Sequence, residues 1–226
     1  MSYTYSQIAK MIDHSLLVPT ITDEQLEKGC HVALDYDVAS VCIKPYYLKR
    51  CAEILKGSTV KASTTIGFPH GGHTTATKVA ESKQAISEGC QELDMVVNIG
   101  KVLSNDWDFV RADIKAVVDL AHDMGQIVKV IFENYYLSDE HKIRLCEICG
   151  ELKADFVKTA TGFAEGGATI EDLKLMRKYS PSHVQIKAAG GIRTFEKLLE
   201  VRSVGVTRVG ATRTVDILEE CKRQLS

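Results

Sequence analysis

The chain has 226 residues, of which 45% are hydrophobic and 26% are charged, the proportions of an ordinary globular domain with a sizeable core. Its formal net charge of -2 and the lack of a basic run argue against nucleic acid or an anionic membrane surface as a partner, and no apolar run is long enough to cross a bilayer. Because the amino terminus lacks the basic and apolar segments of an export signal, we expect a cytoplasmic protein that acts on small molecules.

Short apolar runs alternate with longer amphipathic runs along the whole chain, and no linker or low-complexity tract divides it. The apolar runs predict strands at about 11–18, 38–43, 60–66, 92–97, 127–132, 154–158, 184–187 and 206–209. The amphipathic runs predict helices at about 22–35, 45–55, 74–89, 106–124, 138–150, 169–179 and 194–203, and a last helix that ends at about 224.

Local signals mark the ends of several helices. Thr22 and Gln25 form a capping box at the start of the first helix, and Pro45 suits the first turn of the second. Glycines end four helices that lead into strands, which is typical of glycine caps; they are Gly57, Gly89, Gly125 and Gly150. Eight strand–helix units therefore follow one another, and they predict a single-domain α/β fold, the (β/α)8 TIM barrel, over residues 1–226. An open doubly wound sheet is the alternative, but residues 17–20 lack the nucleotide-binding fingerprint that it needs.

Two lysines stand at the ends of predicted strands, and a glycine-containing loop follows each. Lys158 ends a buried strand, where the cost of burying an ammonium group lowers its pKa and leaves a neutral amine that can attack a carbonyl. If Lys187 stands on a neighbouring parallel strand, each lysine raises the cost of charging the other. The alternative is that either lysine reaches solvent from the end of its strand.

Strand alternation predicts which side chains share the barrel interior with these lysines. An inward Asp94 leaves the apolar residues on either side of it to pack against the helices. By the same rule Asp13 and Lys129 could join a polar network, which would ease burial of each charge and supply acid–base groups. A purely structural ion network remains the alternative.

The loops after the last three strands suggest an anion site. Barrel enzymes often bind phosphate there, because free backbone N–H groups and helix amino termini favour negative charge. The candidate residues are Gly162, Gly190, Gly191, Thr212 and Arg213. Arg213 stands at a helix start, which is unfavourable unless an anion compensates; otherwise its side chain points into solvent.

Two short motifs could suggest a metal. Cys146 and Cys149 lie inside a helical apolar pattern and suit core thiols, and His70 and His73 have no further ligands at a recognisable spacing. The total of seven scattered cysteines fits reduced thiols rather than a disulfide framework.

Five segments resemble the deoxyribose-phosphate aldolase family, class I aldolases on a (β/α)8 barrel. They are 12–17 (IDHSLL), the loop that begins Gly67-Phe68-Pro69, 92–100 (ELDMVVNIG), 157–163 (VKTATGF) and 186–194 (IKAAGGIRT). The resemblance implies reversible cleavage of 2-deoxy-D-ribose 5-phosphate to D-glyceraldehyde 3-phosphate and acetaldehyde, with no metal and no organic cofactor. A homodimer is compatible with it.

The resemblance also implies roles for single residues. Lys158 is expected to form the Schiff base, Lys187 to lower the pKa of Lys158 and move protons, and Asp94 to donate and accept protons. Three further residues are expected to line the substrate pocket: Cys42, Thr159 and Thr161.

The sequence departs from the family pattern at two places. Ala211-Thr212-Arg213 stands where adjacent serines usually meet the phosphate, and Lys44 stands where asparagine or an aromatic residue is expected. The alternatives are a related lysine-dependent or thiolase-like barrel enzyme that acts on a different aldehyde, a phosphosugar isomerase, and a barrel without catalytic activity.

Overall fold

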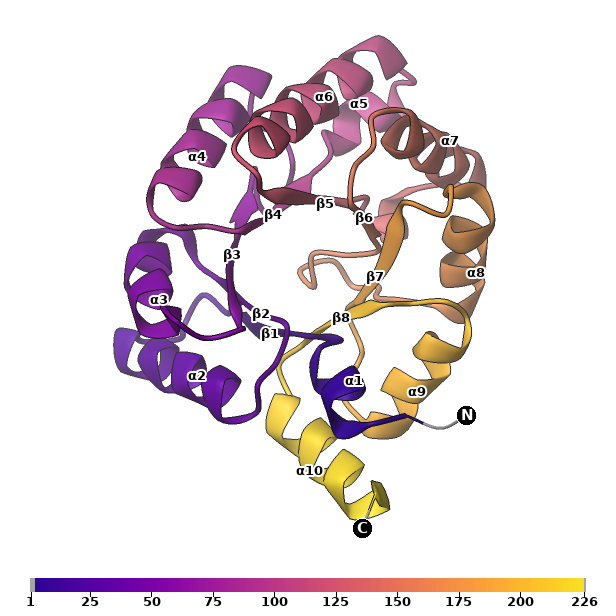
Figure 1. The fold of residues 1–226 in the computed structure, drawn as a ribbon. Coiled ribbons are helices and arrows are strands. Elements are labelled where there is room, and N and C mark those ends of the chain that lie inside the picture. The colour runs from indigo at the N-terminus through magenta and orange to yellow at the C-terminus, as the bar shows by residue number, and fades with distance from the viewer. Residues whose placement is uncertain (1–2, 226) are drawn as a thin grey trace.

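The structure, a computed structural model, describes residues 3–225 and forms a closed barrel of eight parallel strands, each paired with the next and the last with the first. Figure 1 looks down this barrel, with the helices in a ring outside the strands. The strands are β1 (Ile12–Leu16), β2 (Ser40–Ile43), β3 (Lys61–Ile66), β4 (Glu92–Val96), β5 (Ile127–Ile131), β6 (Phe156–Lys158), β7 (Gln185–Ala189) and β8 (Arg208–Ala211). The predicted (β/α)8 barrel is confirmed.

Helices follow every strand of the barrel. They are α2 (Asp23–Asp35), α3 (Leu48–Leu55), α4 (Thr75–Ser87), α6 (Trp107–Asp123), α7 (Asp139–Glu151), α8 (Ile170–Tyr179), α9 (Phe195–Ser203) and α10 (Thr214–Leu225). Three short elements were not predicted: α1 (Tyr5–Ala9), α5 (Ile99–Leu103) and the 3-10 turn η2 (Asn134–Tyr136). The helix predicted at 45–55 begins with a 3-10 turn, η1 (Pro45–Tyr47), which leads directly into α3. Within residues 3–225, no helix has the length and apolar composition needed to span a bilayer.

The predicted helix ends are mostly correct. The capping box is present: the Thr22 side chain accepts from Gln25 N while the Gln25 side chain accepts from Thr22 N. Gly57, Gly89 and Gly125 have φ values of 83°, 97° and 70°, the left-handed conformation that a helix end requires and that glycine adopts without strain.

Several predicted boundaries are wrong. Gly150 lies inside α7 rather than after it, and Lys153 (φ 59°) makes the turn. A Cβ atom at position 150 would stand 2.7 Å from Pro181, so close packing rather than a helix cap explains this glycine. Strand β7 continues to Ala189, and β8 begins at Arg208, two residues later than predicted, so Gly210 and Ala211 belong to the strand and not to the loop that follows it.

The hydrophobic core lies between the strands and the helices and not inside the barrel. On β4, Leu93 and Met95 belong to this core, whereas Asp94 between them is fully buried on the inner side. Val157 and Ile186 pack in the same core beside the two inward lysines, as strand alternation predicts. The barrel interior instead holds hydrogen-bonded polar side chains; they are Asp13, Ser40, Ser63, Glu92, Asp94, Lys129, Lys158, Lys187 and Arg208.

Candidate active site

Strand register brings the two lysines together. Lys158 on β6 is directly opposite Lys187 on β7, and Asp94 on β4 is directly opposite Lys129 on β5. Since the strands are parallel, these side chains point inward toward the carboxyl end of the barrel, where active sites of this fold lie. The arrangement follows from four strands that are far apart in sequence.

Asp94 is the centre of the site. One of its oxygens, Oδ2, lies 2.7 Å from Lys158 Nζ and 2.7 Å from Lys187 Nζ. Its other oxygen, Oδ1, lies 2.9 Å from Lys129 Nζ. The carboxylate therefore joins both candidate catalytic amines and the deeper lysine, and it leaves none of them without a partner.

A second carboxylate, that of Asp13, belongs to the same network. Asp13 Oδ2 lies 2.5 Å from Lys187 Nζ and 3.0 Å from Lys129 Nζ, while Arg208 reaches Asp13 Oδ1 at 2.6 Å. Arg208 also contacts Glu92 at 2.9 Å, and Glu92 in turn contacts Lys129 at 2.6 Å. Asp13 and Lys129, both expected in a supporting network, are thus ion-paired in it, whereas Glu92 and Arg208 were missed by sequence reasoning.

The formal charges of the network favour an uncharged Lys158. Three carboxylates (Asp13, Glu92 and Asp94) face three cations (Lys129, Lys187 and Arg208), so the group is neutral without a proton on Lys158. Burial lowers the pKa of Lys158, and the nearby Lys187 lowers it further, against the opposing effect of Asp94. A neutral amine is therefore more accessible here than on an ordinary lysine.

The partners of Lys158 keep their charges. Burial lowers the pKa of Lys187, but Asp13 and Asp94 outweigh burial and leave that pKa above its ordinary value. Burial raises the pKa of Asp94, yet the three lysines in contact with it hold that pKa well below its usual range. The site thus pairs an amine of lowered pKa with a charged proton donor across one carboxylate oxygen.

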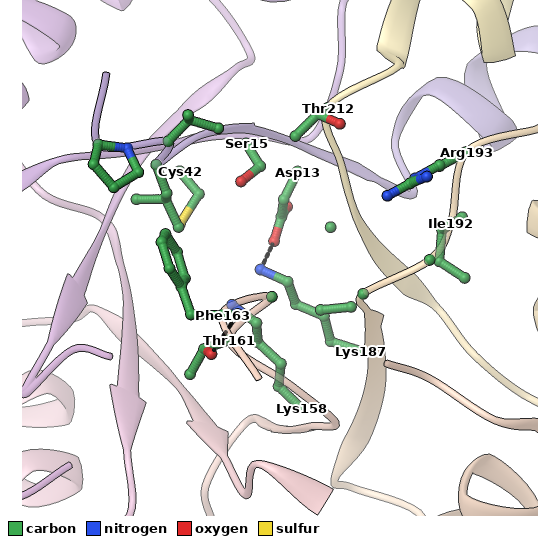
Figure 2. Close-up of a pocket in the computed structure, with 18 residues that line it drawn as sticks. Asp13, Ser15, Cys42, Lys158, Thr161, Phe163, Lys187, Ile192, Arg193 and Thr212 are labelled. Atoms are coloured by element: carbon green, nitrogen blue, oxygen red, sulfur yellow. Dashed lines mark hydrogen bonds and ion pairs between the residues drawn. The ribbon is translucent and has the colours of Figure 1, made fainter. Parts of the chain in front are cut away.

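A cavity of about 270 Å³ opens above these groups. Asp13, Cys42, Lys158 and Lys187 line it, and Figure 2 shows the two lysine side chains reaching into its centre. The predicted pocket residue Cys42 has a pKa raised by burial and by Asp94, so it presents a thiol and not a reactive thiolate. Most of the predicted loop residues also line the cavity; they are Thr161, Gly162, Gly190, Gly191 and Thr212.

Two predicted site residues lie elsewhere. Thr159 is fully buried outside the cavity, and its hydroxyl donates to Ala189 O at 2.9 Å and accepts from Ala189 N at 3.0 Å. Arg213 is turned to the surface, with its guanidinium 2.6 Å from Asp216 Oδ2 and its side chain 64% exposed. Asp216, in the first turn of α10, neutralises the arginine that precedes this helix and was expected to need an anion.

Arg193 takes the place expected for Arg213. It follows β7, lines the cavity beside Gly190 and Gly191, and points toward it in Figure 2. Its position was available in the sequence, because it comes shortly after a lysine-bearing strand and just before the cap of α9. Among the cavity-lining residues, it is the one cation outside the buried network.

Lys44, a departure from the family pattern, serves the first loop of the barrel. Its Nζ donates to Pro19 O and Ile21 O, both at 3.1 Å, and so fastens the loop that leads from β1 to α2. Pro19 lines the cavity, so Lys44 affects the site indirectly, through the position of this loop.

Across residues 3–225, no three His, Cys, Asp or Glu side chains gather closely enough to hold a metal ion. His73 lies 3.8 Å from Glu81 without a third ligand, and Cys146 and Cys149 are both buried in α7 within the hydrophobic core. The titratable side chains that line the cavity are Asp13, Lys158 and Lys187 of the network, together with Cys42 and Arg193.

His14 on β1 faces away from the cavity and carries a pH-dependent stability. Its Nδ1 lies 2.7 Å from Thr214 Oγ1 at the start of α10, and burial lowers its pKa to about 4. In the unfolded chain the His14 imidazole binds a proton near pH 6.5, whereas in the folded chain it does so only near pH 4. The free energy of unfolding should therefore fall as the pH drops from about 6.5 to about 4, by about 3 kcal/mol in total.

Urea unfolding of the parent and of His14→Gln at pH 7 and pH 4.5 measures this pH dependence, which the substitution should flatten. His73→Gln, an exposed histidine, should leave it unchanged, and parallel slopes in parent and His14→Gln would contradict the assignment.

Fold and site together define a (β/α)8-barrel enzyme whose cavity is built around paired lysines. The sequence model of the DeoC/LacD family of aldolases matches residues 7–212, and the chain belongs to the DeoC/LacD aldolase family. A relative from Rhodopirellula baltica named deoxyribose-phosphate aldolase is 62% identical over 223 residues, which cover 99% of this chain and 92% of that protein. One with the same name from Caldanaerobacter subterraneus is 49% identical over 218 residues, 96% of this chain and 94% of the relative.

The fold is shared with solved structures as well. A deoxyribose phosphate aldolase from Aeropyrum pernix, described as a tetramer, superposes with a TM-score of 0.90 at 28% identity, covering 98% of this chain and 93% of that one. The family predicted from the five sequence segments is confirmed.

Proposed function

We propose that this chain is a class I aldolase that reversibly cleaves 2-deoxy-D-ribose 5-phosphate into D-glyceraldehyde 3-phosphate and acetaldehyde, with Lys158 as the Schiff-base nucleophile. The observation that supports this most directly is the pair of lysines that meet at one oxygen of Asp94, each at 2.7 Å, beneath a cavity. The relatives named deoxyribose-phosphate aldolase point to the same substrate.

In the first stage, the neutral amine of Lys158 attacks the aldehyde carbon of the open-chain sugar, and loss of water leaves an iminium. The iminium brings one positive charge to a network that is formally neutral beforehand, at a position 2.7 Å from Asp94 Oδ2. Asp94 therefore stabilises the charge at the point where it develops. Lys187, which remains protonated, is the nearest acid for the departing water.

In the second stage, the sugar's C3 hydroxyl loses its proton and its oxygen forms the new carbonyl at C3, while the electron pair of the C2–C3 bond moves toward the iminium and that bond breaks. D-glyceraldehyde 3-phosphate leaves, and the electrons of the broken bond form the enamine of acetaldehyde on Lys158. Asp94 and Lys187, aided by a water molecule, carry the proton to the enamine carbon, and water then hydrolyses the iminium. The reverse sequence gives aldol addition.

Arg193 is proposed to hold the phosphate together with the backbone of Gly190 and Gly191 and the hydroxyl of Thr212. All four line the cavity, and a guanidinium with nearby backbone N–H groups and a hydroxyl favours an anion. No other cationic side chain of the lining lies outside the buried network.

Replacing Arg193 with alanine should raise KM for deoxyribose 5-phosphate by about 10- to 100-fold, the effect of losing a charge-assisted hydrogen bond, with a smaller effect on kcat. Steady-state kinetics with phosphorylated and unphosphorylated deoxyribose measure this, and the unphosphorylated sugar should be nearly unaffected. Arg213→Ala is the matched control, because Asp216 holds that guanidinium away from the cavity. A loss in Arg213→Ala as large as in Arg193→Ala would contradict the proposed phosphate site.

Borohydride trapping tests the central proposal. Reduction in the presence of deoxyribose 5-phosphate or acetaldehyde should attach the sugar or the two-carbon fragment to Lys158, as located by peptide mass spectrometry, and should abolish activity. An enzyme that cleaves the substrate but carries no adduct on Lys158 after reduction would exclude the lysine mechanism.

We also propose that the protein resides in the cytoplasm. All seven cysteines are buried and none is paired in a disulfide, which fits a reducing cytoplasm. The sequence is compatible with a homodimer and with a monomer, and the Aeropyrum pernix relative is described as a tetramer. Light scattering coupled to size-exclusion chromatography gives the mass in solution and distinguishes these states.

A further inference from the structure

The cavity has two chemically different ends on either side of the lysines. Arg193 and the glycines beside it form a cationic end, whereas Leu17, Val18 and Pro19 contribute an apolar wall. Figure 2 shows Phe163 and Cys42 on the side of the lysines opposite to Arg193. A phosphosugar accounts for the cationic end, and the apolar wall remains without an assigned ligand.

Phe163 is the largest side chain of this apolar end. It comes from the loop after β6, and despite its size it is 45% exposed. Its ring meets the ring of Phe68, from the loop after β3, edge to face at 5.4 Å and 89°. Two loops from distant strands thus meet through an aromatic pair at the rim of the cavity, and part of the Phe163 ring faces water.

A buried carboxylate fixes the position of Phe163. The backbone N–H of Phe163 donates to Thr161 Oγ1 at 3.0 Å, and the Thr161 hydroxyl donates in turn to Glu133 Oε2. The backbone N–H of Thr161 also reaches Glu133 Oε2, at 3.2 Å. Glu133 itself is 2% exposed. The loop therefore presents the ring in a preset place, and little conformational entropy is lost when a ligand covers it.

We propose that Phe163 is a specificity-determining residue which, backed by Phe68, forms a subsite for the alkyl chain of an unphosphorylated acceptor aldehyde. This rests on the proposed aldolase function and concerns its synthetic direction. The enamine carbon on Lys158 forms a carbon–carbon bond to the acceptor's carbonyl carbon, the carbonyl oxygen takes a proton, and water hydrolyses the iminium to release a 3-hydroxyaldehyde. An uncharged alkyl chain gains no binding free energy from the charge of Arg193. At the opposite end of the cavity it displaces water from the exposed ring of Phe163, which favours binding.

The test is the dependence of kcat/KM on acceptor length, with acetaldehyde as donor and propanal, butanal and pentanal as acceptors. In the parent, each added methylene should raise kcat/KM by roughly two- to fourfold, since the ring is only partly shielded from water. Phe163→Ala should remove this length dependence and lower kcat/KM for pentanal by about tenfold. Addition to glyceraldehyde 3-phosphate should change by less than about twofold, because that acceptor uses the cationic end.

Three further variants sharpen the result. Phe163→Leu keeps an apolar side chain and should retain most of the length dependence, and Phe68→Ala, which removes the backing ring, should give an intermediate slope. Met124→Ala removes an exposed apolar side chain at the end of α6, outside the cavity, and should match the parent. An unchanged slope in Phe163→Ala, or an equal loss with glyceraldehyde 3-phosphate, would overturn the subsite. Failure of the parent to use glyceraldehyde 3-phosphate would instead count against the proposed function.

Discussion

Replacing Lys158 with arginine is expected to lower kcat/KM for deoxyribose 5-phosphate by about four orders of magnitude or more, the scale seen when a covalent nucleophile is lost. Arginine keeps an N–H donor beside Asp94, but it adds a fixed charge to the network, and a guanidinium remains protonated and cannot form an iminium. The substitution therefore separates the nucleophilic chemistry of the amine from its hydrogen bond to Asp94. The adduct formed with borohydride should disappear together with the activity.

Lys142 provides the matched control for this change. It is also a buried lysine bound to carboxylates, with Nζ 2.6 Å from Asp172 and 3.0 Å from Asp139, but it lies on α7 away from the cavity. Lys142→Arg should keep nearly full activity. If Lys158→Arg kept even a hundredth of the parental kcat/KM while folding normally, the covalent route through Lys158 would have to be abandoned.

Replacing Lys187 with methionine should lower kcat by about 10²- to 10⁴-fold, the usual contribution of a positioned acid–base group. It should also move the acid limb of the pH profile of kcat/KM to higher pH. Burial and the charge of Lys187 lower the pKa of Lys158, so removal of Lys187 makes the neutral amine harder to reach. Rates measured across pH 5 to 9, with circular dichroism to verify folding, give both quantities.

Asp94→Asn is the opposite test of the same electrostatics. Asp94 raises the pKa of Lys158, so its neutralisation should move the acid limb to lower pH even as kcat falls. A purely structural role for the two residues predicts no such pair of opposite displacements. If the acid limb moved in the same direction in Lys187→Met and in Asp94→Asn, the amine of Lys158 would not control the pH profile.

The barrel and the order of its strands could be predicted from the sequence because they depend on local periodicity. Alternating apolar residues and helix caps recur at each unit, and the inward positions of Asp94, Lys158 and Lys187 follow from counting along single strands. Lys158 could be singled out for the same reason: a cation at the end of an apolar run requires an explanation.

What could not be predicted depends on contacts between distant elements. Arg208 joins the network through contacts with Asp13 and Glu92 on two other strands, which no single segment reveals. Glu92 stands two residues before Asp94 on β4, so strand alternation could have placed it on the inner side. The choice between Arg193 and Arg213 as the cation of the cavity depends on where each side chain turns, and Asp216 decides it for Arg213. The i to i+3 spacing of Arg213 and Asp216 was a local signal that could have prevented the error.

The separation of core and charged interior has a consequence for how this protein can change. The residues that hold the helices to the strands, such as Leu93 and Val157, face away from Asp94 and Lys158, although they are their immediate neighbours in the chain. The residues that stabilise the fold and the residues that form the reactive site thus lie on opposite faces of the same strands. Directed evolution could therefore change the hydrophobic residues between strands and helices to raise stability without disturbing the Lys158 amine. Only substitutions of charged residues inside the barrel would need a compensating residue of opposite charge.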